Sequence, residues 1–211
     1  MDQVTGIIEK IDKKEITIGV IGIGYVGLPL ALEYAKQGIK TIGFDIDTVK
    51  VDSINKGINY NEDLDSNEIE EVARKGFLTA TADFSQLAGC DCIYICVPTP
   101  FTPNKDPDIS FIEEASRSVL RSLKQGQIVI LKSTTFPGTT ENHVQPILEQ
   151  GGMKAGSDFY LAFSPERIDP GNKTWNTKNT PIIVGGINEV STGLACRITK
   201  KIGRASCRER V

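Results

Sequence analysis

The segment 14–47, KEITIGVIGIGYVGLPLALEYAKQGIKTIGFDID, constrains the fold of this chain more than any other stretch. Its apolar run from Ile16 to Ile21 predicts a strand buried on both faces of a sheet. A glycine-rich turn at residues 22–27 follows, and apolar spacing then predicts a helix over 28–37. Residues 40–44 predict a second strand. This order of strand, glycine turn, helix and strand predicts a dinucleotide-binding unit.

The glycine turn fits the pattern G-x-G-x-x-G. Gly22 permits a tight turn, Gly24 lets the backbone come close to a pyrophosphate, and Gly27 allows close packing of the helix on the strand. Tyr25 and Val26 lie where the helix begins, and a helix N-terminus offers unpaired N–H groups and a partial positive charge to phosphates. A purely structural glycine turn is the alternative, but the position between strand and helix favours cofactor binding.

Asp45 follows the second strand, at the position where an acidic residue can accept hydrogen bonds from a ribose diol. Residues 47–55 predict a helix with Asp47 as its N-cap and Val49 among its apolar positions. Lys50 lies on the first turns of that helix, near the predicted adenosine ribose. A solvated helix lysine is the alternative interpretation of Lys50.

Strand and helix patterns alternate along the rest of the chain, which predicts an α/β fold with a Rossmann-like, doubly wound parallel sheet. Residues 1–13 show helical apolar spacing, and they predict either a short amphipathic helix on the edge of the domain or a frayed leader. The predicted strands are 77–81, 91–97, 127–132, 158–162 and 181–185, and the predicted helices are 66–75, 83–88, 110–124, 139–150 and 188–201. The helix over 66–75 is predicted to begin with an imperfect capping box, with Ser66 as its capping residue.

Three of these strands end in polar loops, and ligands bind at the carboxyl ends of strands in an open α/β sheet. Thr99 lies in CVPTP, Thr134 in KSTTFPGTT, and Glu166 and Arg167 in SPERIDPGN. The threonine cluster could instead cap the following helix, and the third loop could be an ordinary turn with a surface ion pair. His143, the only histidine, is interpreted as a packing or solvated residue.

Composition limits the possible partners. The net charge of −3 gives no electrostatic case for nucleic acid or an anionic membrane. No long apolar run or signal-peptide pattern is present, so we expect a cytoplasmic protein. The chain has 211 residues, of which five are cysteines, and this does not indicate a disulfide framework. Cys90, Cys92 and Cys96 match no zinc spacing, so we predict structural cysteines and no metal.

Taken together, GVIGIGYVGLPLA, FDID with Lys50, CVPTP, KSTTFPGTT and SPERIDPGN resemble the UDP-glucose/GDP-mannose dehydrogenase family. The motifs are most similar to its UDP-N-acetylglucosamine 6-dehydrogenase branch, with the UDP-N-acetylmannosamine dehydrogenases next. The resemblance implies a Rossmann domain that binds NAD and an enzyme that oxidises the C6 alcohol of a UDP-sugar twice, to the uronic acid, for surface polysaccharide precursors. Asp45 should disfavour the 2′-phosphate of NADP.

The resemblance also implies roles for single residues. The three glycines would hold the pyrophosphate, and Asp45 with Lys50 would contact the adenosine ribose. Thr99 and Thr134 would line the nicotinamide end, and Thr134 would also help to position a catalytic water. Glu166 would serve the acid–base and hydrolytic steps, with Arg167 beside it in the substrate loop.

The family's cysteine nucleophile, in a G-G-x-C motif, and its catalytic lysine and asparagine are not found here. We therefore expect residues 15–202 to be the NAD-binding domain, after an N-terminal extension at 1–14. The chain would be truncated before the central helix and the UDP-binding domain. The alternative function is an NAD-binding module without activity of its own. Residues 203–211, GRASCRERV, depart from the family pattern and resemble a translated sequencing adapter, so they are interpreted as non-native rather than as a genuine basic tail. The parent enzyme is expected to be a homo-oligomer.

Overall fold

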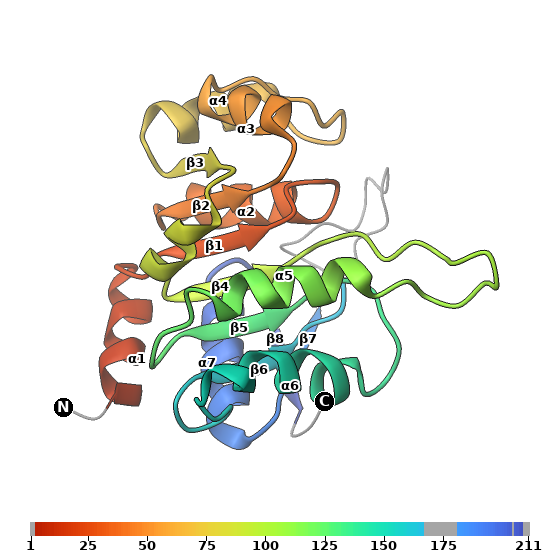
Figure 1. Ribbon diagram of the computed structural model, residues 1–211. Helices are drawn as coiled ribbons and strands as arrows, with labels where there is room; N and C mark the ends of the chain where they lie inside the picture. The colour runs from red at the N-terminus through yellow and green to blue at the C-terminus, as the bar shows by residue number, and fades with distance from the viewer. Residues whose placement is uncertain (1–2, 167–180, 204, 209–211) are drawn as a thin grey trace.

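A single sheet of eight strands, in the order β3-β2-β1-β4-β5-β6-β7-β8, forms the centre of the molecule (Figure 1). The computed structural model describes residues 3–166, 181–203 and 205–208. The order of the first six strands is that of a Rossmann fold. The strands are β1 Ile18–Ile21, β2 Thr41–Phe44, β3 Leu78–Thr81, β4 Cys92–Ile95, β5 Ile128–Leu131, β6 Tyr160–Phe163, β7 Ile182–Gly186 and β8 Ala205–Arg208.

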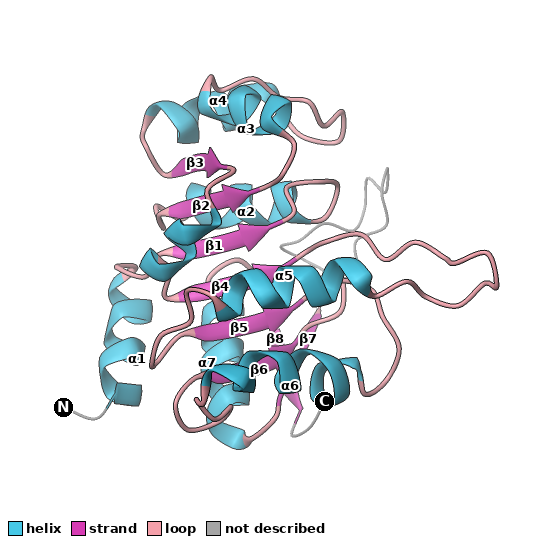
Figure 2. Cartoon of the chain, in the orientation of Figure 1, coloured by secondary structure: helices cyan, strands magenta, loops and turns pink. Residues whose placement is uncertain are grey.

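Helices cover both faces of this sheet, with α5 and α6 in front of it and α2 and α7 behind it in Figure 2. None of the helices in the described ranges is long and apolar enough to cross a membrane. The α-helices are α1 Gln3–Lys13, α2 Gly27–Lys36, α3 Thr48–Asn55, α4 Ser66–Arg74, α5 Ser110–Leu120, α6 Gln145–Leu148 and α7 Glu189–Thr199. Shorter helical turns are η1 Phe84–Gly89, η2 Thr140–Val144 and η3 Glu149–Gly151.

Each central strand contributes to two hydrophobic cores because its side chains alternate between the faces of the sheet. In β5, Ile128 and Ile130 belong to the core under α1, α2, α4 and α7, whereas Val129 and Leu131 belong to the core under α5 and α6. All four residues of β5 are buried. This two-sided burial explains why the strands appear in the sequence as continuous apolar runs.

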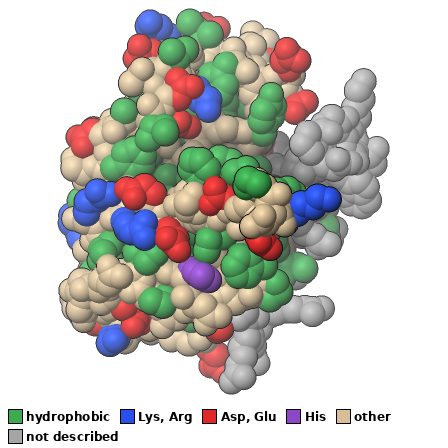
Figure 3. All heavy atoms as spheres, turned by 45° about the vertical axis from the view of Figure 1, so that its right-hand side comes forward, with side chains coloured by type: hydrophobic (Ala, Val, Ile, Leu, Met, Phe, Trp, Pro, Cys, Tyr) green, Lys and Arg blue, Asp and Glu red, His purple; other side chains and the backbone are tan. Residues whose placement is uncertain are grey.

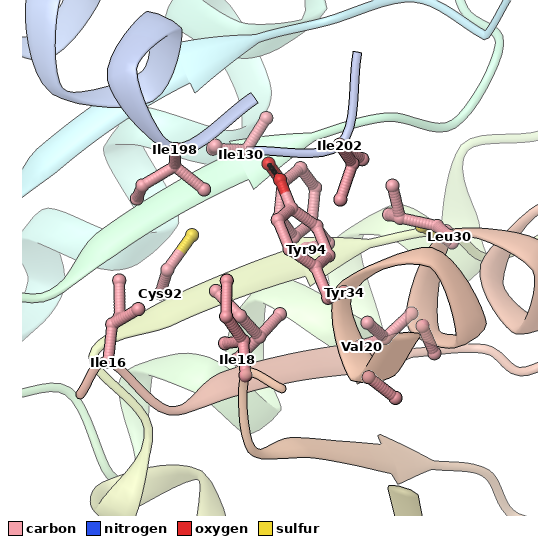
Figure 4. Packing of buried hydrophobic residues seen from close by; sticks show 14 of the residues in the cluster. Ile16, Ile18, Val20, Leu30, Tyr34, Cys92, Tyr94, Ile130, Ile198 and Ile202 are labelled. Carbon is pink, nitrogen blue, oxygen red and sulfur yellow. Dashed lines mark hydrogen bonds between the residues drawn. The ribbon is translucent and has the colours of Figure 1, made fainter. Parts of the chain in front are cut away.

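The larger core also contains two tyrosines, whose hydroxyl groups pair inside it (Figure 4). The hydroxyl oxygens of Tyr34 and Tyr94 lie 2.6 Å apart. Burial raises the pKa of both phenols, so both remain protonated and each hydroxyl has a hydrogen-bonding partner. The pair therefore joins α2 to β4 and leaves neither buried hydroxyl without a hydrogen-bonding partner.

The predicted doubly wound parallel sheet is confirmed except at one pair of strands, since β7 runs antiparallel to β6. A parallel neighbour requires a crossover connection, usually a helix. The sequence between Phe163 and Ile182 is rich in proline and asparagine and shows no helical apolar period. The pairing of β7 with β8 is parallel, with α7 as the crossover. That residues 203–211 are non-native stays a prediction.

Three details of the predicted helices differ in the structure. The N-cap of α4 is Asp65, whose carboxylate accepts the Asn67 N–H, and not Ser66. Val49 on α3 is 72% exposed, although its spacing predicted burial. The helix predicted over 139–150 begins as the π-helical turn η2 and becomes α-helical only at α6, close to Pro146, which has no N–H to donate.

The N-terminal segment forms the amphipathic helix α1, which confirms one of the two predictions for it. Ile7 and Ile11 are buried in the larger core. Asp12 pairs with Arg197 of α7 through two hydrogen bonds of 2.8 and 2.6 Å. Lys10 pairs with Asp91, immediately before β4, at 2.7 Å. The helix is thus attached to α7 and to the start of β4.

Candidate cofactor site

A cavity of about 1460 Å³ opens at the carboxyl ends of β1, β2, β4 and β5. It lies where the strand order reverses between β1 and β4, the position at which open α/β sheets bind ligands. Most of the predicted cofactor residues line it: Gly22, Gly24, Tyr25, Val26, Asp45, Lys50, Thr99 and Thr134. Gly27 lies behind the cavity, at the start of α2.

The glycine loop leaves room for a ligand on one side and packs tightly on the other. Gly22 has a φ of +86°, and a Cβ at this position would meet the Cys96 carbonyl oxygen at 2.7 Å. A Cβ on Gly27 would lie 1.8 Å from the carbonyl oxygen of Gly22, which confirms the close packing expected there. A Cβ on Gly24 would meet nothing within 4 Å. The backbone at Gly24 therefore faces open space.

The N-terminus of α2 is left open toward this space. Helices α3, α4 and α7 are capped by the side chains of Asp47, Asp65 and Asn188. No side chain in the described part of the chain caps α2. The first N–H groups of a helix need partners, and an anion such as a pyrophosphate can supply them. The loop and the helix start therefore fit the diphosphate of a dinucleotide.

Asp45 is held in a fixed orientation beside the loop. Its Oδ2 accepts a hydrogen bond from the Ile23 N–H at 3.0 Å, and its Oδ1 accepts one from the Asp47 N–H at 3.0 Å. The Lys50 Nζ lies 3.9 Å from Oδ2. Each carboxylate oxygen has more than one lone pair, so Asp45 keeps capacity to accept hydrogen bonds from a ribose diol.

The other end of the cavity is formed by the ends of β4 and β5. The Thr99 hydroxyl donates to the Thr134 carbonyl at 2.7 Å, and the Ser133 hydroxyl donates to the Val97 carbonyl at 2.7 Å. These bonds bring together the two threonines that the sequence predicted at neighbouring strand ends. Ser133 was not predicted, although it lies inside the same hydroxyl-rich motif.

Glu166 does not line this cavity but lies beside it, after β6. Its Oε2 is 3.0 Å from the Nζ of Lys132, which is the residue after β5. The two side chains are only 10% and 5% exposed. Sequence reasoning treated Lys132 as the end of a strand and missed this buried ion pair. Arg167, the second residue predicted for this loop, lies outside the described residues.

The cysteines near the cavity are buried thiols. Burial raises the pKa of Cys96 to about 12, and the Lys132 and Glu166 charges have opposing smaller effects on it. Burial likewise raises the pKa of Cys90 to about 12. Both thiols are therefore protonated at neutral pH, which makes them poor nucleophiles. In the described ranges, no group of three His, Cys, Asp or Glu residues could hold a metal ion.

Helix α5 forms a wall of the cavity that the sequence analysis did not anticipate. Phe111, Glu114, Ala115 and Ser118 line it at spacings of three and four residues. Such spacing places them on one side of the helix. The sequence analysis predicted only a helix over 110–124 and assigned no ligand-facing side to it.

His143 is placed on η2, away from the cavity. Its ring meets the Phe136 ring edge-on, with 5.8 Å between centroids. Figure 3 shows the histidine in purple at the surface, next to hydrophobic side chains. This placement agrees with the interpretation of His143 as a packing residue.

Comparison with known proteins relates this geometry to a family. Residues 16–203 match the model of the UDP-glucose/GDP-mannose dehydrogenase family, NAD binding domain. Over 174 residues the chain is 36% identical to a UDP-N-acetyl-D-glucosamine 6-dehydrogenase of Pseudomonas aeruginosa, covering 82% of this chain and 40% of that protein. It is also 36% identical to a UDP-N-acetyl-D-mannosamine dehydrogenase of Pyrococcus horikoshii, covering 84% of this chain and 43% of that protein.

Solved structures show the same relationship. The crystal structure of an NDP-N-acetyl-D-galactosaminuronic acid dehydrogenase from Methanosarcina mazei superposes with a TM-score of 0.86 at 34% identity, covering 97% of this chain and 46% of that one. The chain thus spans less than half the length of these relatives. The fold, the cavity and the match over residues 16–203 lead to one conclusion. This chain belongs to the UDP-glucose/GDP-mannose dehydrogenase family, of which it carries the NAD-binding domain.

Proposed function

We propose that this chain is the NAD-binding part of a nucleotide-sugar dehydrogenase that oxidises the C6 alcohol of a UDP-hexose to the uronic acid with two equivalents of NAD. UDP-N-acetylglucosamine is the proposed substrate, and surface polysaccharide precursors are the proposed products. One observation carries the proposal: a single cavity has the glycine loop and Asp45 at one end and Thr99 and Thr134 at the other. Its location between β1 and β4 supports an extended dinucleotide.

The residues at the first end would hold the cofactor. When bound, NAD accepts hydride from the sugar carbon, so the protein's task is to position the two reactants. Gly22, Gly24 and Gly27 would let the backbone around Tyr25 and Val26 surround the pyrophosphate. The Asp45 carboxylate would accept hydrogen bonds from the adenosine ribose, with Lys50 beside it.

The residues at the second end would serve the chemistry. Thr99 and Thr134 would line the nicotinamide end, and the Thr134 hydroxyl would help to hold a water. A general base must take the C6 hydroxyl proton, and the Glu166 carboxylate is the proposed acceptor. Arg167 would contact the substrate. The hydrogen bond from Thr99 to the Thr134 carbonyl supports the pairing of these two strand ends in one site.

A second candidate function is favoured by the length of the relatives. The chain spans 40% of the Pseudomonas aeruginosa protein, and no G-G-x-C motif for a cysteine nucleophile occurs in its sequence. The 211-residue polypeptide would then bind NAD without catalysing oxidation by itself. Its parent enzyme, its oligomeric state and its cytoplasmic location stay predictions.

The 211-residue chain is expected to bind NADH and to form none from UDP-N-acetylglucosamine and NAD. Binding is measured by isothermal titration or NADH fluorescence, and turnover by absorbance at the NADH band. Measurable turnover would refute the proposal that the chain is only part of an active enzyme. Absence of NADH binding would refute the assignment of the cavity.

An Asp45→Asn variant is expected to bind NADH roughly 10- to 100-fold more weakly, because hydrogen bonds to a charged acceptor contribute roughly 1.5–3 kcal/mol. It is also expected to narrow the preference for NADH over NADPH, because the carboxylate no longer repels a 2′-phosphate. Titrations with both cofactors measure this ratio. Asp52→Asn is the matched control, since Asp52 lies exposed on α3 outside the cavity and should leave the ratio unchanged. An unchanged ratio for Asp45→Asn would contradict the role of Asp45.

A further inference from the structure

The connector between α3 and α4, residues 56–65, contacts the glycine loop. The Tyr60 hydroxyl donates a hydrogen bond of 2.5 Å to the carbonyl oxygen of Ile23, the residue between Gly22 and Gly24. Tyr60 is half-buried and packs against the larger core. Ile23 itself is buried, 1% exposed. This contact joins segments 37 residues apart in sequence.

Both peptide groups of Ile23 are thereby fixed by side chains from other segments. Its N–H donates to Asp45 Oδ2 at 3.0 Å, and its C=O accepts from Tyr60. A trans peptide is planar, with N–H and C=O on opposite sides. The bond from Tyr60 therefore sets the plane of the Ile23–Gly24 peptide and aims the Gly24 N–H away from the tyrosine. Gly24 is the loop residue whose Cβ position is open.

The connector is built to hold Tyr60 in place. The Asn59 side-chain amide donates to the carbonyls of Asn61 at 2.9 Å and Leu64 at 2.8 Å, and its Oδ1 accepts the Asn61 N–H at 2.8 Å. Asn61 is 4% exposed, and its own Oδ1 accepts the Asp63 N–H at 3.0 Å. The two asparagines on either side of Tyr60 thus close the connector on itself.

The phenol is suited to act as a permanent donor. Burial raises the pKa of Tyr60, and the nearby carboxylates of Asp45 and Asp47 raise it further. The hydroxyl therefore keeps its proton throughout the physiological pH range. Glycine residues have wide conformational freedom, so a loop of the form G-x-G loses much entropy when it becomes ordered around a ligand.

We propose that Tyr60 is a positioning residue for the cofactor, which orients the Ile23–Gly24 peptide so that the glycine loop is preorganised for a pyrophosphate. This inference rests on the proposed binding of NAD in the cavity. Tyr60 would therefore affect the binding of ligands that carry a diphosphate. It would not affect the binding of adenosine, because Asp45 would hold that half of the cofactor.

A Tyr60→Phe variant of the full chain tests this role, with Tyr34→Phe as the matched control. Tyr34 also loses a buried, hydrogen-bonded hydroxyl, but at the end of α2 remote from the loop. Affinities for NADH, ADP-ribose and adenosine are measured by calorimetry and ligand-observed NMR. Tyr60→Phe is expected to lower the affinities for NADH and ADP-ribose by about 3- to 10-fold, the equivalent of one hydrogen bond. Its affinity for adenosine is expected to stay unchanged. Tyr34→Phe is expected to change none of the three.

The other possible results would contradict the positioning role of Tyr60. Equal affinities in Tyr60→Phe and the unmodified chain would overturn it, and so would an equal loss for adenosine, which would indicate a general disturbance. If the unmodified chain fails to bind NADH, the proposed function falls and this inference falls with it. If Tyr60→Phe does not fold, the Asn59→Ser variant is used for the test instead. This variant loosens the connector but keeps the Tyr60 hydroxyl. Unchanged NADH affinity in Asn59→Ser would then overturn the role.

Discussion

A Gly27→Ala variant is expected to lose about 4 kcal/mol or more of unfolding free energy and to bind no NADH. The new Cβ would lie 1.8 Å from the Gly22 carbonyl oxygen and 3.0 Å from its carbonyl carbon, and neither atom belongs to a movable side chain. Helix α2 would have to move away from β1. Such a loss exceeds that of most single substitutions and is a large part of the stability of a typical domain. Urea unfolding and NADH titration measure the two effects.

Gly193→Ala is the matched control for that variant. Gly193 lies exposed in the interior of α7, and a Cβ there would meet nothing within 4 Å. Alanine is the better helix former, so this variant is expected to be more stable by roughly 0.5–1 kcal/mol. A stability for Gly27→Ala within 1 kcal/mol of the unmodified chain would show that α2 and β1 do not pack as described.

Lys132→Met is expected to destabilise the chain by about 3–5 kcal/mol, because removing one member of a buried ion pair is strongly destabilising. The two groups are 3.0 Å apart and almost fully buried. The double variant Lys132→Met, Glu166→Leu removes both charges and is expected to regain part of the loss, since a buried ion pair contributes little net stability relative to apolar residues. Urea unfolding of the single and double variants measures the difference.

Lys75→Met provides the comparison at the surface. Lys75 pairs with Glu71 one turn earlier on α4, and both side chains are more than half exposed. Exposed pairs of this kind contribute about 0.3–0.5 kcal/mol. If Lys132→Met lowered the free energy of unfolding by no more than Lys75→Met, the ion pair between Lys132 and Glu166 would not stabilise the fold as described.

Local patterns predicted the parts of the site that local chemistry determines. Gly22 and Gly27 sit between an apolar run and a helical pattern, and Asp45 ends the next strand, so a single stretch of sequence specified this end of the cavity. Thr99 and Thr134 could be predicted at the same edge because the carboxyl ends of parallel strands meet there.

Contacts between distant segments could not be predicted in this way. Tyr60 reaches Ile23 through the folding of a connector, and Lys132 reaches Glu166 across neighbouring strands. Nothing in the residues near Lys132 indicates that its ammonium group is buried rather than solvated. The direction of β7 could not be predicted either, because the apolar pattern of Ile182–Gly186 is the same for a parallel and an antiparallel strand.

Helix α1 has a consequence for how the chain folds during synthesis. Its Asp12 pairs with Arg197, 185 residues later in the sequence. At the usual rate of about 5–20 residues per second, a ribosome needs roughly 10–40 s to make the residues in between. During that interval the apolar side of α1, with Ile7 and Ile11, lacks its neighbour α7. Helix α1 is therefore synthesised long before its contact with α7 can form, and a nascent chain stalled before α7 would expose the apolar side of α1 to chaperones and proteases.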